Sequence, residues 1–200
     1  MNKLIASTAA VMLALSSVFS ASPTAMAAPF QIERVTQNTE RTEEVPMTAF
    51  APNATYAVCF TPGQDCEGLI VREIKHATKS ILMQAYLFTS AAIAKALVQA
   101  KLRGINVRAI LDKSQRSEPY TGATSLLQAG IPLAIDDKPA IAHSKIFIFD
   151  QQTVLTGSFN FTRAAQMKNA ENLIVIKGDL NLVKLYTANW MARWEVATPM

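Results

Sequence analysis

Residues 142–162, AHSKIFIFDQQTVLTGSFNFT, place the imidazole of His143 and the ammonium group of Lys145 in an apolar, strand-like stretch. Side chains alternate between the two faces of a β-strand, so these two point the same way, about 7 Å apart. That separation suits two groups that hold one small anion. The same alternation turns Asp150 to the other face, and we therefore expect Asp150 to have a structural role.

A second polar pair follows in TGSFNFT, where Ser158 and Asn160 repeat the two-residue spacing and Gly157 lets the backbone approach a ligand closely. A hydroxyl, an amide, an ammonium and an imidazole together form a cradle for a phosphate group. No aspartate cluster or second histidine lies beside it, so we expect no metal ion there. The alternative is a purely structural role for these four residues. In that case His143 and Lys145 extend to water from the end of a sheet, and Ser158 and Asn160 are turn residues.

Taken jointly, these residues resemble the signature of the phospholipase D superfamily, His-x-Lys-x4-Asp followed by Gly-Ser-x-Asn. The matching positions are His143, Lys145, Asp150, Gly157, Ser158 and Asn160. The stretches SILMQAYLFTS, AKALVQAKLRGINVRAILD, AGIPLAIDD and KNAENLIVI are similar to the small bacterial endonuclease branch, the Nuc-type proteins, over about residues 56–194. In that branch the signature occurs once per chain and two subunits complete one active site, and this sequence likewise has one copy.

The resemblance implies a role for each residue of the cradle. His143 would be the nucleophile that forms a phosphohistidine, and Lys145 and Asn160 would bind the phosphate. Ser158 would hydrogen-bond the phosphate or the imidazole. Glu171 matches the carboxylate that binds the far nitrogen of the histidine and fixes its tautomer. The alternative for Glu171 is a surface glutamate at a strand end.

Chemistry independently favours a homodimer. Displacing an alcohol from a phosphodiester needs a nucleophile on phosphorus and an acid for the departing oxygen, and one imidazole cannot do both in one step. The only other histidine, His76, lies on the flank of an amphipathic helix, and we expect it to face solvent. The second acid is then His143 of a two-fold partner. A bell-shaped pH dependence should follow.

The first 27 residues predict a cleaved secretory signal, with Lys3, an apolar stretch from Leu4 to about Phe19, and small residues Ala25 and Ala27. An uncleaved anchor is the alternative, but polar residues interrupt the run before the roughly 20 residues that span a membrane. We therefore expect a periplasmic or secreted protein with no stable membrane insertion. Residues 28–55 are polar with three prolines and read as an extended arm or linker.

Export to an oxidising compartment changes how the two cysteines are interpreted. Cys59 and Cys66 lie in CFTPGQDC, where Pro62 and Gly63 favour a turn, and we predict a disulfide between them. The chain carries 19 Lys and Arg against 15 Asp and Glu, a formal net charge of +4. This excess favours polyanionic partners only weakly.

Residues 56–200 predict one α/β domain, a phospholipase D-like sandwich with a mixed β-sheet flanked by helices, because strand-like runs alternate with helical patterns. The expected helices span 67–79, a segment capped by Ser90 and stopped by Gly104, a short stretch ending near Gly130, and a last one from Asp179 to about Trp194. The expected strands span 55–60, 80–88, 105–111, a region near Leu133, 145–149, 153–155 and 171–177.

These features predict a secreted, metal-independent phosphodiesterase that needs no cofactor, an endonuclease of little sequence preference acting on DNA, with RNA as a further substrate. Polar segments near the cradle, DKSQRSEPYTG and TRAAQMKN, suit phosphate contacts. A lipid phosphodiesterase is one alternative, with Phe159 and Phe161 as the membrane-contacting candidates near the motif. A catalytically silent nucleic-acid-binding module is another, and it would retain DNA binding without forming product.

Overall fold

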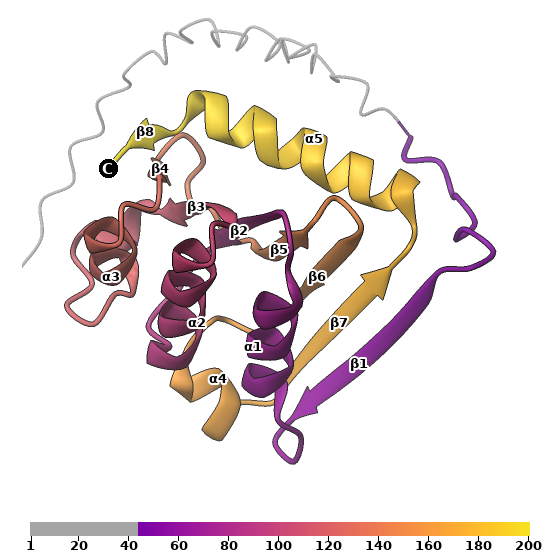
Figure 1. The fold of residues 1–200 in the computed structure, drawn as a ribbon, viewed down its shortest axis with the longest axis horizontal. Helices are drawn as coiled ribbons and strands as arrows, with labels where there is room; N and C mark the ends of the chain where they lie inside the picture. The colour runs from indigo at the N-terminus through magenta and orange to yellow at the C-terminus, as the bar shows by residue number, and fades with distance from the viewer. Residues whose placement is uncertain (1–43) are drawn as a thin grey trace, which may run out of the picture. The chain divides into compact units, whose positions relative to one another are not determined.

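One mixed sheet of eight strands runs through the protein, whose computed structural model describes residues 44–200 (Figure 1). The strand order is β1-β7-β6-β5-β2-β3-β4-β8. The strands are β1 Thr55–Thr61, β2 Ser80–Ala85, β3 Asn106–Asp112, β4 Leu133–Asp136, β5 Lys145–Phe149, β6 Thr153–Gly157, β7 Glu171–Lys177 and β8 Thr198–Pro199. Strands β2, β3 and β4 are parallel, and every other neighbouring pair is antiparallel.

Helices cover both faces of the sheet. Figure 1 shows α5 on one side and α1, α2, α3 and α4 on the other. The helices are α1 Cys66–His76, α2 Ala91–Leu102, α3 Ala123–Gln128, α4 Arg163–Met167 and α5 Leu180–Val196, with a 3-10 turn at Lys113–Arg116. The predicted α/β sandwich with a mixed, helix-flanked sheet is confirmed.

Alternation along β5 divides the core between these two layers. Phe147 and Phe149 belong to the larger cluster under α1 and α2, whereas Ile146 and Ile148 face the smaller cluster under α5. The smaller cluster contains Trp190, which is fully buried and donates its indole N–H to the carbonyl of Met83 at 2.9 Å. Trp194 stacks on Trp190 with ring centroids 5.1 Å apart.

The edge strand β1 is bonded to α1 by the predicted disulfide. Cys59 and Cys66 form it with their Cα atoms 5.6 Å apart, and both residues are buried. The opposite face of β1 carries Tyr56, Val58 and Phe60, which are 74%, 41% and 56% exposed. This edge of the sheet therefore presents an apolar face that no helix of residues 44–200 covers.

Two predicted elements end three residues earlier than expected, in both cases because of long-range contacts, and the other boundaries differ by smaller shifts. The helix expected over 67–79 ends at His76, since Asp150 binds the backbone N–H groups of Thr78, Lys79 and Ser80. The strand expected over 80–88 ends at Ala85, since Phe88 turns into the core and bridges to Phe161.

The predicted signal peptide at 1–27, and residues 28–43 of the predicted arm, lie outside the described residues. Residues 47–54 belong to the same compact unit as the sheet, and Ala51 N–H donates to Asp179 at 2.9 Å. Within residues 44–200 no helix has both the length and the apolar character to cross a membrane.

Candidate active site

The residues of the predicted cradle gather at one end of the sheet, which we call the open end. His143 precedes β5 by two residues, and Lys145 is the first residue of that strand. Because β5, β6 and β7 are successively antiparallel, the start of β5 lies beside the end of β6 and the start of β7. Ser158 and Asn160 follow β6, and Glu171 begins β7. The fold thus brings all five residues together.

His143 and Lys145 contact each other directly. The Lys145 Nζ lies 2.9 Å from Nδ1 and 3.1 Å from Nε2 of the His143 ring, and it donates to the His143 carbonyl at 2.9 Å. A charged Lys145 can donate only to an unprotonated ring nitrogen, and the tautomer of the imidazole decides which of the two nitrogens accepts. Lys145 is 5% exposed, while His143 is exposed to solvent. A buried cation therefore lies beneath an accessible imidazole.

Burial lowers the pKa of Lys145, because removing an ammonium group from water disfavours its charged form. The carboxylate of Glu171 opposes this shift through its negative charge, and the net pKa stays below the ordinary value of a lysine. A buried ammonium group that has only neutral hydrogen-bond acceptors gains more from an arriving anion than one already in a salt bridge.

Ser158 and Glu171 are linked by a short hydrogen bond. The Ser158 hydroxyl donates to Glu171 Oε2 at 2.6 Å, and Asn169 Nδ2 donates to Glu171 Oε1 at 2.8 Å. Asn172 N–H in turn donates to Ser158 Oγ at 3.0 Å. The hydrogen bond expected between Glu171 and the ring of His143 is not formed, because Glu171 accepts from Ser158 and Asn169 instead.

Asn160 and Gly157 contribute in different ways. The Oδ1 atom of Asn160 is buried and has no hydrogen-bond partner among the described residues. A phosphate oxygen only accepts hydrogen bonds, so the group of Asn160 that could bind it is the Nδ2 donor. Gly157 has a φ of 150°, and a Cβ atom at this position would collide with the carbonyl of Asn172 on β7. A glycine is therefore required for β6 to lie close to β7 just before Ser158.

Asp150 lies at the other end of β5, which we call the closed end. Its carboxylate accepts four hydrogen bonds of 2.7–2.9 Å, from the N–H groups of Thr78, Lys79 and Ser80 and from the Thr78 hydroxyl. Desolvation raises the pKa of Asp150, but these hydrogen bonds lower it further, so the net pKa is below the usual value. The geometry agrees with the structural role expected from the alternation.

Sequence reasoning missed two residues next to His143. The Tyr86 ring lies 4.6 Å from the His143 ring between centroids, and Lys145 Nζ lies 5.2 Å from the centroid of Tyr86. Asp112, 2% exposed at the end of β3, accepts from Ala142 N–H at 2.7 Å and so fixes the loop that carries His143. The pairing of Ala85 with Lys145 puts Tyr86 there, and no local sequence signal reveals that pairing.

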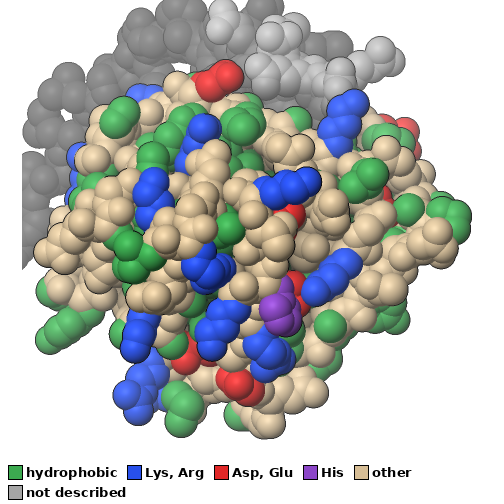
Figure 2. All heavy atoms as spheres, in the orientation of Figure 1, with side chains coloured by type: hydrophobic (Ala, Val, Ile, Leu, Met, Phe, Trp, Pro, Cys, Tyr) green, Lys and Arg blue, Asp and Glu red, His purple; other side chains and the backbone are tan. Residues whose placement is uncertain are grey.

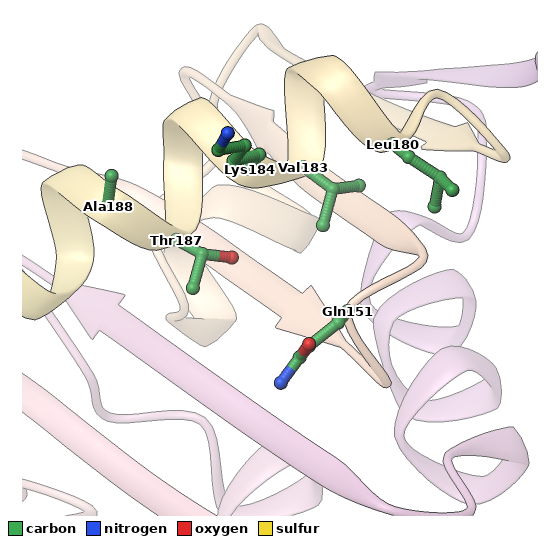
Figure 3. A pocket seen from close by; sticks show the side chains of 6 residues that line it. All are labelled: Gln151, Leu180, Val183, Lys184, Thr187 and Ala188. Atoms are coloured by element: carbon green, nitrogen blue, oxygen red, sulfur yellow. The ribbon is translucent and has the colours of Figure 1, made fainter.

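Across residues 44–200, no group of three or more His, Cys, Asp or Glu could hold a metal ion. A groove of about 440 Å³ runs along α5 on the other layer (Figure 3). It is lined by Gln151, Leu180, Val183, Lys184, Thr187 and Ala188, none of which belongs to the cradle.

Comparison with known proteins agrees with this fold. The family model described as "Cardiolipin synthase, PLD-like domain" matches residues 70–194. The chain belongs to this phospholipase D-like family, which confirms the resemblance seen in the sequence. It is a phosphodiesterase of the phospholipase D superfamily.

Individual relatives carry different names. "Phospholipase D" of Rickettsia prowazekii is 44% identical over 137 residues, which are 68% of this chain and 66% of the relative. "Mitochondrial cardiolipin hydrolase" of Xenopus laevis is 32% identical over 62% of this chain and 58% of its own. The crystal structure of Nuc from Salmonella typhimurium, a phospholipase D family member, has a TM-score of 0.70 and 36% identity, over 74% of this chain and 98% of Nuc.

Proposed function

We propose that the protein is an exported, metal-independent endonuclease that cleaves DNA, and RNA as a further substrate, through a phosphohistidine on His143. The single observation that carries this proposal is the exposed imidazole of His143 held against the buried ammonium group of Lys145. A neutral, accessible imidazole can attack phosphorus, and the ammonium group beneath it can neutralise a phosphate oxygen.

In the first step, a ring nitrogen of His143 attacks phosphorus and the bond from phosphorus to the leaving oxygen breaks. Lys145 exchanges its contact with the ring for a phosphate oxygen, and the amide of Asn160 binds the phosphate as well. Both groups stabilise the negative charge that builds on the equatorial oxygens. The departing oxygen takes a proton from an imidazolium on the opposite side and leaves as an alcohol.

In the second step, water attacks the phosphohistidine. The imidazole that gave up its proton now accepts one from the water, whose oxygen bonds to phosphorus as the bond to the His143 nitrogen breaks. The products are a phosphate monoester and His143 in its original neutral form. Glu171 accepts the hydroxyl hydrogen of Ser158 and so fixes the orientation of that hydroxyl in the cradle.

A homodimer supplies the second imidazole. His76, the chain's only other histidine, ends α1, beside the residues that Asp150 binds at the closed end. The whole of β5 separates that end from His143, about 13 Å from Lys145 to Phe149 at the rise of a strand. The general acid is therefore the partner's His143. Exposed apolar side chains at the open end, Phe60 on β1 and Ile141 before His143, offer contacts to a second copy.

DNA suits the surroundings of the cradle better than a membrane does. Phe159 and Phe161, the expected membrane-contacting residues, are both fully buried. The polar stretch after β6 forms α4, whose residue Arg163 is exposed beside the open end. A lipid phosphodiesterase remains the second candidate, because the relatives named "Phospholipase D" and "Mitochondrial cardiolipin hydrolase" carry lipid names.

One experiment separates these candidates. The protein is incubated with plasmid DNA, with cardiolipin vesicles and with phosphatidylcholine vesicles, each with a chelator present. We expect nicked and fragmented DNA and little release of lipid headgroups. Faster hydrolysis of either lipid would replace the nuclease by the lipid enzyme, and DNA binding without any product would identify a silent binding module. Loss of all cleavage with the chelator would contradict the metal-independent mechanism.

Export is the remaining part of the proposal. The disulfide between Cys59 and Cys66 supports it, since such bonds persist in oxidising compartments such as the bacterial periplasm. Expression of the full sequence in a bacterium, followed by fractionation and N-terminal sequencing, tests it. The proposal requires a chain that begins after Ala27 in the periplasmic or external fraction.

A further inference from the structure

We propose that the outer surface of α1 and α2 is a second binding site for the phosphate backbone of a nucleic acid, separate from the cradle at the open end. This inference rests on the proposed nuclease function and adds a contact that the chemistry itself does not need. We call this area the helix-pair surface. It consists of Arg72, Lys75, Lys79, Lys95, Lys101 and Arg103.

Charge is concentrated on this part of the chain. Residues 65–106, which begin with Asp65, the N-cap of α1, contain these six cations and three acidic residues, Asp65, Glu67 and Glu73, which gives +3 of the formal net charge of +4 of the whole sequence. Figure 2 shows Lys and Arg side chains across the face that carries α1 and α2, with a smaller number of Asp and Glu side chains between them. A concentrated patch of one sign is the electrostatic footprint of a polyanion-binding surface.

Neither glutamate forms an ion pair with a cation of the helix-pair surface. Glu73 is 9% exposed and pairs with Lys177 on β7 at 2.7 Å, and Glu67 accepts from the Ser90 hydroxyl at 2.5 Å. None of the six cations forms an ion pair with any residue in the range 44–200. Their charges are therefore free to meet phosphate groups.

Helix stabilisation accounts for only some of these cations. Lys75 and Lys101 lie in the last turns of α1 and α2, where a cation is favourable to the helix dipole. Arg103 binds the carbonyls of Ile74 and Lys75 and so caps α1. Arg72 precedes the last turn of α1, and Lys79 lies beyond its end. Neither position benefits from the dipole or from a carbonyl contact among the described residues.

The helix-pair surface is remote from the cradle. Both helices end at the closed end, since Asp150 binds Thr78 and Lys79 just after α1, and Asn106, which begins β3 four residues after the end of α2, donates to the Lys79 carbonyl. Helices of 11 and 12 residues are about 17 Å long, the length of about five base pairs of DNA. A polymer can therefore span both sites, whereas a single phosphodiester can occupy only the cradle.

Binding of a 30-base-pair duplex to the His143→Ala protein, measured from 50 to 300 mM salt, tests the proposal without cleavage. The double variant Arg72→Gln with Lys79→Gln should bind at least tenfold more weakly at 100 mM salt. Its slope of log affinity against log salt should fall by about 2, since each phosphate contact contributes about 0.9. The charge-conserving double variant Arg72→Lys with Lys79→Arg, and Lys184→Gln on α5, should leave the slope unchanged.

Kinetics separate this proposal from the proposed function. With His143 intact, the Arg72→Gln, Lys79→Gln protein should hydrolyse bis(4-nitrophenyl) phosphate normally and show a raised KM for plasmid DNA. An unchanged salt slope would overturn the second site while leaving the nuclease in place. Equal losses on both substrates by a variant with unchanged urea unfolding would show that the two residues act on the chemistry at the cradle rather than at a separate site. Lost binding to phosphatidylglycerol vesicles with unchanged DNA binding would assign the surface to membranes. Either result would overturn the proposal.

Discussion

The signature residues at the two ends of strand β5 differ in how fully their polar groups are hydrogen-bonded. At the closed end, Asp150 accepts four hydrogen bonds, and its carboxylate is occupied by the backbone of residues 78–80. At the open end, His143 is exposed, Lys145 has only neutral acceptors, and the Asn160 oxygen has no partner in the part of the chain that the structure describes. One motif therefore combines a satisfied group that holds the fold with unsatisfied groups that await a ligand.

This difference explains why the motif contains an aspartate at a distance from the chemistry. Asp150 fixes the connection between α1 and β2, and β2 in turn lies beside β5 and carries Tyr86 to the imidazole. The closed end sets the register of the strands on which the open end depends. Substitutions at the two ends should therefore separate activity from stability.

The largest effect is expected for His143→Ala, at the open end. Loss of the nucleophile should lower kcat on DNA by at least about 10³-fold, and loss of an exposed side chain should change the free energy of unfolding by no more than about 0.5 kcal/mol. Cleavage of a fluorescent duplex and urea unfolding measure the two quantities. His76→Ala is the control and should retain full activity. Parental activity in His143→Ala would mean that another group attacks phosphorus.

Lys145→Met should lower kcat by about 10²-fold, because a phosphate oxygen loses its buried cation. Stability should rise at neutral pH, since the pKa of Lys145 is lowered and its charged form destabilises the fold. The destabilisation by the charged ammonium group is complete at pH values below the pKa of Lys145 in the folded protein. It disappears as the pH rises toward the pKa of a lysine in the unfolded chain, about 10.4. Unfolding in urea from pH 7 to 10 should therefore show a gain that shrinks with pH. A less stable variant would mean that the ammonium group supports the fold.

Asp150→Asn should lower the free energy of unfolding by about 2 kcal/mol, because the neutral amide replaces a charged carboxylate that accepts four hydrogen bonds. Asparagine tolerates the positive φ of 53° at this position, so the variant keeps the backbone conformation while it removes the charge and turns one acceptor oxygen into an NH2 donor. Since the folded pKa of Asp150 is below its unfolded value, its contribution is present above about pH 4 and lost at lower pH. The variant and the parent should therefore converge in acid. Activity per folded molecule should be unchanged.

Tyr86→Leu should have the smallest effect, a several-fold lower kcat/KM, because His143 and Lys145 lose an aromatic contact worth about 1 kcal/mol. Tyr86→Phe retains the ring and should restore most of the activity. A positioning role also predicts a shifted pH profile for Tyr86→Leu, since the imidazole would no longer be held against the ring. Equal losses in both variants would instead assign the role to the phenolic hydroxyl.

Local pattern was sufficient for several elements. Strands 145–149 and 171–177 were predicted with their observed boundaries, since each is an apolar run closed by polar residues. Ser90 and Asp179 cap their helices as expected, through the N–H groups of Ile93 and Leu182. The disulfide followed from two cysteines separated by a turn.

Elements that depend on distant residues could not be predicted. Helix α4 has five residues in a polar stretch, too few for helical periodicity, and β8 has two. The end of α1 is set by Asp150, and the place of Tyr86 by the pairing of β2 with β5. The chemistry of the site could be predicted because its residues lie in one short motif. Tyr86 and Asp112, which hold His143 and its loop in place, follow β2 and end β3, far from the motif in the sequence.

Both tryptophans of the chain lie on α5, stacked on each other, and one is anchored to β2. Intrinsic fluorescence is therefore a natural reporter for detachment of that helix from the sheet, and it is silent about loosening around His143. A melting curve recorded in this way monitors one layer only, and circular dichroism or hydrogen exchange is needed to observe the other.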